Sequence, residues 1–125
     1  MPGVKYYFDS YALIGILSGN ENYEKFKLSE GVSTLLNLME IQYYLHREGI
    51  GDEEIKDTLN FMIPLCISYS ALDCFDAVKF RFEKKDRNLS YIDCLGYILA
   101  KKQGAAFVTG DREFETMPNV KFIRV

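Results

Sequence analysis

Four acidic residues, far apart in the chain, are the side chains best suited to do chemistry: Asp9, Glu40, Asp93 and Asp111. Carboxylates brought close together repel one another, so such a cluster destabilises a fold unless divalent cations lie between them. Oxygen ligands alone suit Mg²⁺ or Mn²⁺, whereas zinc normally recruits cysteine or histidine. One or two such ions can activate a water for in-line attack on a phosphodiester. If the four acids converge, the sequence therefore predicts metal-assisted hydrolysis that needs no histidine base.

Three of these acids also have a purely structural explanation. Asp9 follows an apolar run and could simply cap the next helix. Asp93 lies three residues after Ser90, a spacing close to that of a capping box, although Gly96 one turn later would leave room for a metal and a phosphate. Asp111 could cap a short turn after a glycine. Taken singly, each of the three leaves both explanations open.

Glu40 is the most informative of the four acids. Its neighbours three and four positions away on a helix form a largely apolar surface, made by Leu36, Asn37, Tyr43 and Tyr44. A carboxylate on such a surface loses hydration and must find a cation, a metal or a proton. The alternative is a side chain at the boundary of the core that reaches water past its neighbours.

The elements that must position these acids alternate between strands and helices. Short apolar or β-branched runs predict strands at residues 4–8, 31–34, 65–69, 105–109 and 120–125. Helical patterns cover residues 10–17 (with Ser10 as the cap), 21–27, 35–47, 52–62, 70–85 and 90–103. This order predicts an α/β fold in which helices cover both faces of one parallel sheet, a three-layer α/β/α sandwich. The working site of such a sheet lies at the carboxyl ends of its strands, where Asp9 and Asp111 would stand.

Composition sets broad limits on the class of protein. A length of 125 residues fits one domain over residues 1–125, and 48% apolar with 26% charged residues excludes a disordered chain. No apolar run approaches the roughly 20 residues of a membrane-spanning helix. The first residues contain no apolar stretch typical of a secretory signal, so we expect a cytoplasmic protein without membrane contacts.

Cysteine and histidine offer little for catalysis. Cys66, Cys74 and Cys94 are spaced too irregularly for a metal knuckle, and their odd number argues against a disulfide framework. We expect buried, reduced thiols. His46 is the only histidine, which excludes a His-rich zinc site, and no nucleophile motif accompanies it to suggest a Ser-His-Asp triad.

The net charge of −3 does not decide whether the partner is a nucleic acid. Proteins that hold nucleic acids by charge alone are usually basic, but bound metal ions invert the local charge of an acidic site. Arg112, beside Asp111, is a candidate for phosphate contact. A solvated helix face better explains the remaining basic cluster, which consists of Lys79, Arg81, Lys84, Lys85 and Arg87.

Four segments, in order along nearly the whole chain, resemble the PIN-domain family and, within it, the VapC-type toxins of toxin–antitoxin systems. They are Tyr7-Phe8-Asp9-Ser10, Asn37-Leu38-Met39-Glu40, Leu89-Ser90-Tyr91-Ile92-Asp93 and the run from Gly104 to Phe114. Each segment is short, so the specificity comes from all four occurring together. The spacing from Asp93 to Asp111 is also typical of the family.

The resemblance implies a five-stranded parallel sheet and a Mg²⁺- or Mn²⁺-dependent endoribonuclease that cleaves single-stranded or structured RNA. By matching position, Asp9, Glu40, Asp93 and Asp111 would be the catalytic, metal-binding acids, and Thr109 would orient a carboxylate or a water. It further implies the toxin of a type II toxin–antitoxin system, blocked by a cognate antitoxin, and a homodimer. Some of the 18 tyrosine and phenylalanine residues could form those surfaces.

Two other classes remain as alternatives. A non-catalytic PIN-like module could bind RNA or a protein without cleaving, although an intact set of four acids argues against it. A phosphoacceptor signalling domain also gathers acids at strand ends, but it requires a lysine at the end of a late strand. Gly110-Asp111-Arg112 does not supply that lysine.

Overall fold

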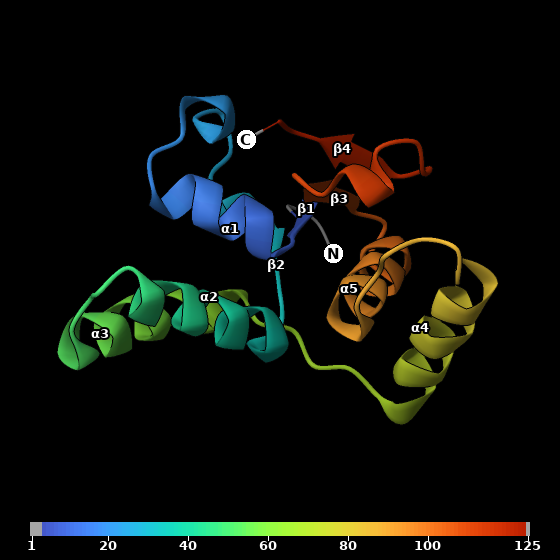
Figure 1. Cartoon of the computed structure of the whole chain (residues 1–125), viewed down its shortest axis with the longest axis horizontal. Helices are drawn as coiled ribbons and strands as arrows, with labels where there is room; N and C mark the ends of the chain where they lie inside the picture. The colour runs from blue at the N-terminus through green and yellow to red at the C-terminus, as the bar shows by residue number, and fades with distance from the viewer. Residues whose placement is uncertain (1–3, 125) are drawn as a thin grey trace.

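A computed structural model describes residues 4–124 and places one parallel sheet at the centre of the fold (Figure 1). Its strands are β1 (Tyr6–Phe8), β2 (Gly31–Val32), β3 (Ala106–Thr109) and β4 (Val120–Phe122). They are ordered β2-β1-β3-β4, and every neighbouring pair is parallel. The chain fills the sheet outward from β1 in both directions, so the strand order reverses between β1 and β3. The carboxyl ends of these two strands therefore form the edge where α/β proteins place their sites.

Five helices connect and cover the strands of the described residues. They are α1 (Ser10–Leu17), α2 (Leu35–Arg47), α3 (Asp52–Met62), α4 (Ala71–Glu83) and α5 (Tyr91–Lys102). Short 3₁₀ turns lie at Glu21–Tyr23, Leu28–Glu30, Ile63–Leu65 and Arg112–Phe114. In Figure 1, α4 lies on the outer side of α5, away from the sheet. None of the helices between residues 4 and 124 combines the length and apolarity needed to cross a membrane.

The sheet is buried on both faces, as the sequence predicts. Successive side chains of a strand point to opposite faces. Tyr7 and Phe107 accordingly pack in a core with residues of α5, whereas Phe8 and Val108 pack in a second core with residues of α1, α2 and α3. This confirms the α/β class with helices on both sides of a parallel sheet.

The predicted fifth strand at residues 65–69 is reduced to a single parallel bridge between Ser33 and Cys66. The Ser33 N–H donates to the Leu65 carbonyl at 3.0 Å, and the Ile67 N–H donates to the Ser33 carbonyl at 2.9 Å. The ladder stops there because the neighbouring β2 is only two residues long and Thr34 already caps α2. The described sheet therefore has four strands, with this bridge beyond β2.

Several predicted boundaries also change. Helices α2 and α3 span the predicted residues, but the residues at 21–27 form only a short 3₁₀ turn at their start. The last strand ends at Phe122, and Val125 lies outside the described residues. Prediction of a buried thiol is right for Cys94 but wrong for Cys74, which is exposed on α4, and Cys66 is only partly buried.

Candidate active site

Asp9 is the most buried of the four acids, with 2% of its surface exposed. It follows β1 and is itself the N-cap of α1, a role that the sequence assigned to Ser10: its Oδ1 accepts the Ala12 N–H at 2.8 Å. Its Oδ2 is buried and has no hydrogen-bond partner of ordinary geometry among the described residues. Burial raises the pKa of Asp9 to about 8, with the Thr109 hydroxyl and the Ala12 N–H opposing the rise and nearby Asp93 adding to it. A buried carboxylate oxygen without a donor is the group that a cation would satisfy.

Asp93 and Asp111 each use one carboxylate oxygen in a helix cap. Asp93 completes the predicted capping box of α5, since its Oδ2 accepts the Ser90 N–H at 3.0 Å. Asp111 Oδ1 accepts the Glu113 N–H at 2.9 Å, and the Asp111 N–H donates to Thr109 Oγ1 at 2.9 Å. No hydrogen bond of the described residues uses the second oxygen of either carboxylate. Capping and cation binding are therefore compatible roles for both acids.

Glu40 reaches the same region from α2. It is partly buried, and the Ser10 hydroxyl donates to its Oε1 at 2.5 Å. Burial raises the pKa of Glu40, the Ser10 hydrogen bond opposes that rise, and the charge of Asp93 adds to it. This carboxylate has lost part of its hydration, as its apolar helix face predicts, but its partner is a neutral hydroxyl and not the predicted cation, metal or proton.

The four acids act on one another through their charges. Asp93 and Asp111 both raise the pKa of Asp9, and Asp93 also raises that of Glu40. Tyr11, at the start of α1, has its pKa raised by burial and then by all four carboxylates. The acids therefore lie within electrostatic range of one another near the carboxyl ends of β1 and β3. Within residues 4–124, however, no group of three or more acidic, cysteine or histidine side chains is arranged closely enough to hold a metal ion.

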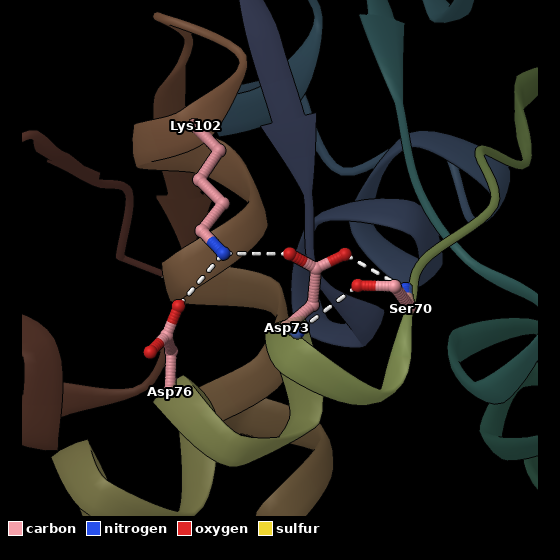
Figure 2. Close-up of polar contacts among 4 residues, drawn as sticks. All are labelled: Ser70, Asp73, Asp76 and Lys102. Carbon is pink, nitrogen blue, oxygen red and sulfur yellow. Dashed lines mark hydrogen bonds and ion pairs between the residues drawn. The ribbon is translucent and has the colours of Figure 1, made fainter.

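A second capping box, at the start of α4, has an ion pair that the capping box of Asp93 lacks within residues 4–124. Figure 2 shows the capping box that Ser70 and Asp73 form at the start of α4. Ser90 and Asp93 form the same capping box at the start of α5. Asp73 also pairs with Lys102 Nζ at 2.6 Å, and that lysine reaches Asp76 at 2.8 Å. The Lys102 contact holds the pKa of Asp73 below its usual range, whereas burial raises the pKa of Asp93. None of the four candidate acids has such an ion pair among the described residues.

Gly96 does not provide the space for a metal that its position suggested. A methyl group added there would lie 2.9 Å from Cε1 of Tyr7 and 3.2 Å from Cε1 of Phe107. The glycine instead lets α5 pack closely against β1 and β3. Its effect on Asp93 is indirect, because it sets how closely the helix that carries this acid approaches the sheet.

A groove of about 380 Å³ between α1 and α2 adjoins the acids. Ser10 and Glu40 lie in its wall, together with Tyr11, Tyr44 and Arg47. Arg112 is exposed beside Asp111, as the sequence suggests.

Two arginines of the predicted solvated helix face have defined partners instead. Arg81 Nε donates to the Leu89 carbonyl at 2.9 Å, and Arg87 donates to the Glu113 carbonyl at 2.7 Å. Both arginines therefore fix the loop that precedes α5.

Two residues that hold Glu40 through hydrogen bonds, Ser10 and Asn37, were not predicted from the sequence as part of the site. Ser10 lies directly against this carboxylate, and Asn37 Nδ2 donates to Ser10 Oγ at 3.0 Å. The available signal was spacing, because Asn37 precedes Glu40 by three residues on α2 and therefore shares its face. Only the packing of α1 against α2 identifies Ser10 as the link.

Comparisons with known proteins concern the family and the fold of the chain. The profile of the family described as PIN domain matches residues 6–120. No curated protein matches the chain.

Several solved structures share the fold. A toxin–antitoxin complex from Klebsiella pneumoniae has a TM-score of 0.75 at 18% identity, covering 97% of this chain and 99% of that one. DNA-bound VapBC from Salmonella typhimurium has a TM-score of 0.72 at 22% identity, covering 97% and 98%. VapBC2 from Rickettsia felis, bound to a promoter DNA fragment, has a TM-score of 0.66 at 19% identity with the same coverage. The match of the family profile over most of the sequence shows that this chain belongs to the PIN domain family.

Proposed function

We propose that this chain is a metal-dependent endoribonuclease of the VapC type, acting in the cytoplasm as the toxin of a toxin–antitoxin pair. The observation that carries the proposal is the buried, unpartnered Oδ2 of Asp9, which lies within the electrostatic influence of Asp93 and Asp111. A fold that holds such a group without a protein donor gains most from binding a cation there.

The donor chemistry fits a hard divalent cation. Asp9, Glu40, Asp93 and Asp111 offer only oxygen atoms, which suit Mg²⁺ or Mn²⁺ and not zinc. Asp9 Oδ2 and the unused oxygens of Asp93 and Asp111 would hold the ion, with Glu40 completing the set. When bound, the ion would supply an activated water and neutralise charge at the scissile phosphate. Because no closed cage is present among the described residues, binding would draw the acids closer together.

Thr109 has a positioning role in this proposal. Its side chain is fully buried, and its Oγ1 already accepts the Asp111 N–H. The hydroxyl proton is then free to point toward Asp9 and lowers its pKa, but the two side chains form no hydrogen bond of ordinary geometry. Thr109 would thus lie between the two acids that end β1 and β3 and partly offset the effect of burial on the pKa of Asp9.

The groove between α1 and α2 suits a single-stranded RNA substrate. Tyr11 and Tyr44 offer aromatic faces on which unpaired bases can stack, and Arg47 can meet a phosphate. The groove begins at Glu40, so a strand lying in it would extend away from the reacting phosphodiester.

An antitoxin partner is proposed from the relatives in the fold comparison, since the solved structures named above are toxin–antitoxin complexes, two of them with DNA. A homodimer is proposed from the outer face of α4. Large apolar side chains project from it into solvent: Leu72, Phe75, Val78 and Phe82.

The test is cleavage of labelled single-stranded RNA with Mn²⁺ or Mg²⁺, with and without EDTA. Wild-type protein should cleave only with metal, and Asp9→Asn and Asp93→Asn should lose at least about a hundredfold in rate. Asp73→Asn is the matched control, because Asp73 occupies the same capping box on α4. Cleavage that survives both site substitutions would contradict the assigned site.

A binding module that does not cleave is the second candidate, favoured by the lack of a closed metal cage in the described residues. It predicts metal-independent RNA or protein binding and no cleavage by wild-type protein with any divalent ion. The same cleavage assay, accompanied by an RNA-binding measurement, separates the two.

A further inference from the structure

A buried chain of hydrogen bonds runs from the core of the sheet to Glu40. The Tyr7 hydroxyl, on β1, donates to Asn37 Oδ1 at 2.6 Å. Asn37 Nδ2 donates to Ser10 Oγ at 3.0 Å, and Ser10 Oγ donates to Glu40 Oε1. Tyr7 is fully buried and Asn37 is 2% exposed, so water cannot replace these partners at the inner end. The chain joins β1, α1 and α2 at the point where Glu40 meets the site.

The shortest contacts give the donors of this chain one consistent direction, and the Tyr7 hydroxyl also lies 3.4 Å from Thr34 Oγ1. Thr34 Oγ1 accepts the Asn37 N–H as the cap of α2, which leaves its own proton to donate to Asn37 Oδ1 at 3.0 Å. With the Tyr7 hydroxyl as a second donor, the amide oxygen of Asn37 is fixed inward and its NH₂ group outward. Ser10 Oγ accepts from that NH₂ group, so the Ser10 proton is directed to Glu40.

We propose that Ser10 and Asn37 are positioning residues that hold Glu40 with Oε1 occupied and Oε2 presented to the site. This inference rests on the proposed function, since it concerns the carboxylate offered to the cation. Partners of this kind fix the orientation of a ligand and keep it ready to bind.

The arrangement also explains how a carboxylate persists on an apolar helix face without a cation of its own. Burial disfavours the charge of Glu40, and no lysine or arginine among the described residues pairs with it. The Ser10 donor replaces part of the lost hydration. Asp9 and Ser10 are adjacent, so the first turn of α1 fixes two of the four acids at once.

The test measures Mn²⁺ affinity of the full chain by calorimetry, together with kcat and KM for a single-stranded RNA. Ser10→Ala removes the donor to Glu40, and Asn37→Leu removes the group that directs it. Both should bind Mn²⁺ roughly tenfold more weakly and lose kcat in proportion, with KM for RNA unchanged. Ser10→Thr keeps the hydroxyl and should restore both quantities.

Thr58→Ala is the matched control, because Thr58 loses one hydroxyl hydrogen bond, to the Glu54 carbonyl on α3. Thermal unfolding in EDTA checks that each variant folds. If Ser10→Ala does not fold, the Mn²⁺ affinity of Asn37→Leu alone tests the positioning role. Wild-type Mn²⁺ affinity in both Ser10→Ala and Asn37→Leu would overturn the positioning role alone. Absence of Mn²⁺ binding by wild-type protein would overturn the proposed function itself and this inference with it.

Discussion

At the scale of single residues, the candidate site consists of carboxylates that form no ion pairs among the described residues. Asp9 is the extreme case, because it is buried, has an unpartnered oxygen and has a pKa raised to about 8 from an ordinary value of 3.8. Its neutral form is therefore the one that the metal-free fold prefers. Metal binding would reverse that preference.

The stability of the metal-free protein should consequently depend on pH. The pKa of Asp9 is higher in the folded state than its ordinary value of 3.8. Asp9 therefore contributes stability that is fully present below pH 3.8 and is lost as pH rises through about 8. In EDTA, the free energy of unfolding should fall between about pH 5 and pH 8, by at most about 1.4 kcal/mol per pH unit from this group. Urea unfolding of wild-type protein and Asp9→Asn measures this. Equal pH dependence of the two proteins would contradict the burial argument.

The paired capping boxes give a second prediction at this scale. Asp73→Asn removes the ion pair with Lys102 at a partly exposed position and should lower the free energy of unfolding by up to about 1 kcal/mol. Asp93→Asn removes a charge that burial disfavours, so metal-free stability at neutral pH should stay the same or rise. Chemical denaturation in EDTA compares them, and a larger loss for Asp93→Asn would be the contrary result.

At the scale of elements, close packing of α5 on β1 and β3 sets the position of Asp93. Gly96→Ala would place a methyl group against Tyr7 and Phe107. Overpacking of this kind lowers the free energy of unfolding by about 1–3 kcal/mol. The higher helix propensity of alanine offsets about 1 kcal/mol of that loss. We expect a net loss in thermal unfolding. Gly51→Ala is the control, since a methyl there meets nothing within 4 Å. Unchanged stability of Gly96→Ala would show that α5 can shift freely.

The elements also show how far the sequence alone reaches. The bounds of α2 and α3 follow from local patterns of apolar residues and caps, and the structure confirms them. Residues 65–69 have a strand-like sequence, but their pairing depends on how much of β2 is available, which is a tertiary property. Asp9 and Ser10 are both good caps, and packing of α1 against α2 decides that Ser10 turns to Glu40 instead.

The candidate acids could be named from the sequence, but their support could not. Position at strand ends and the family resemblance identify Asp9 and Asp111, and an apolar helix face identifies Glu40. The contribution of Asn37 depends on the direction of buried hydrogen bonds from Tyr7 and Thr34, which no sequence pattern specifies. The same holds for the unpartnered oxygen of Asp9.

At the scale of the whole molecule, the proposed RNA substrate is a polyanion, which an acidic chain could attract only through local features. The groove between α1 and α2 provides aromatic faces and Arg47 next to Glu40. Tyr44→Leu and Arg47→Ala should each raise KM for single-stranded RNA several-fold, which corresponds to a loss of about 1 kcal/mol in binding free energy. The value of kcat should stay nearly unchanged. Steady-state kinetics measures both constants. A loss confined to antitoxin binding, with RNA kinetics intact, would assign the groove to a protein partner.

The central claim is that Asp9 Oδ2 receives a divalent cation. Anomalous diffraction from crystals of the full chain grown with Mn²⁺ tests it most directly. We expect a manganese peak about 2.0–2.3 Å from Asp9 Oδ2, with Asp93, Asp111 or Glu40 among the other ligands. Manganese bound only elsewhere, with Asp9 Oδ2 hydrogen-bonded to a protein donor, would contradict it.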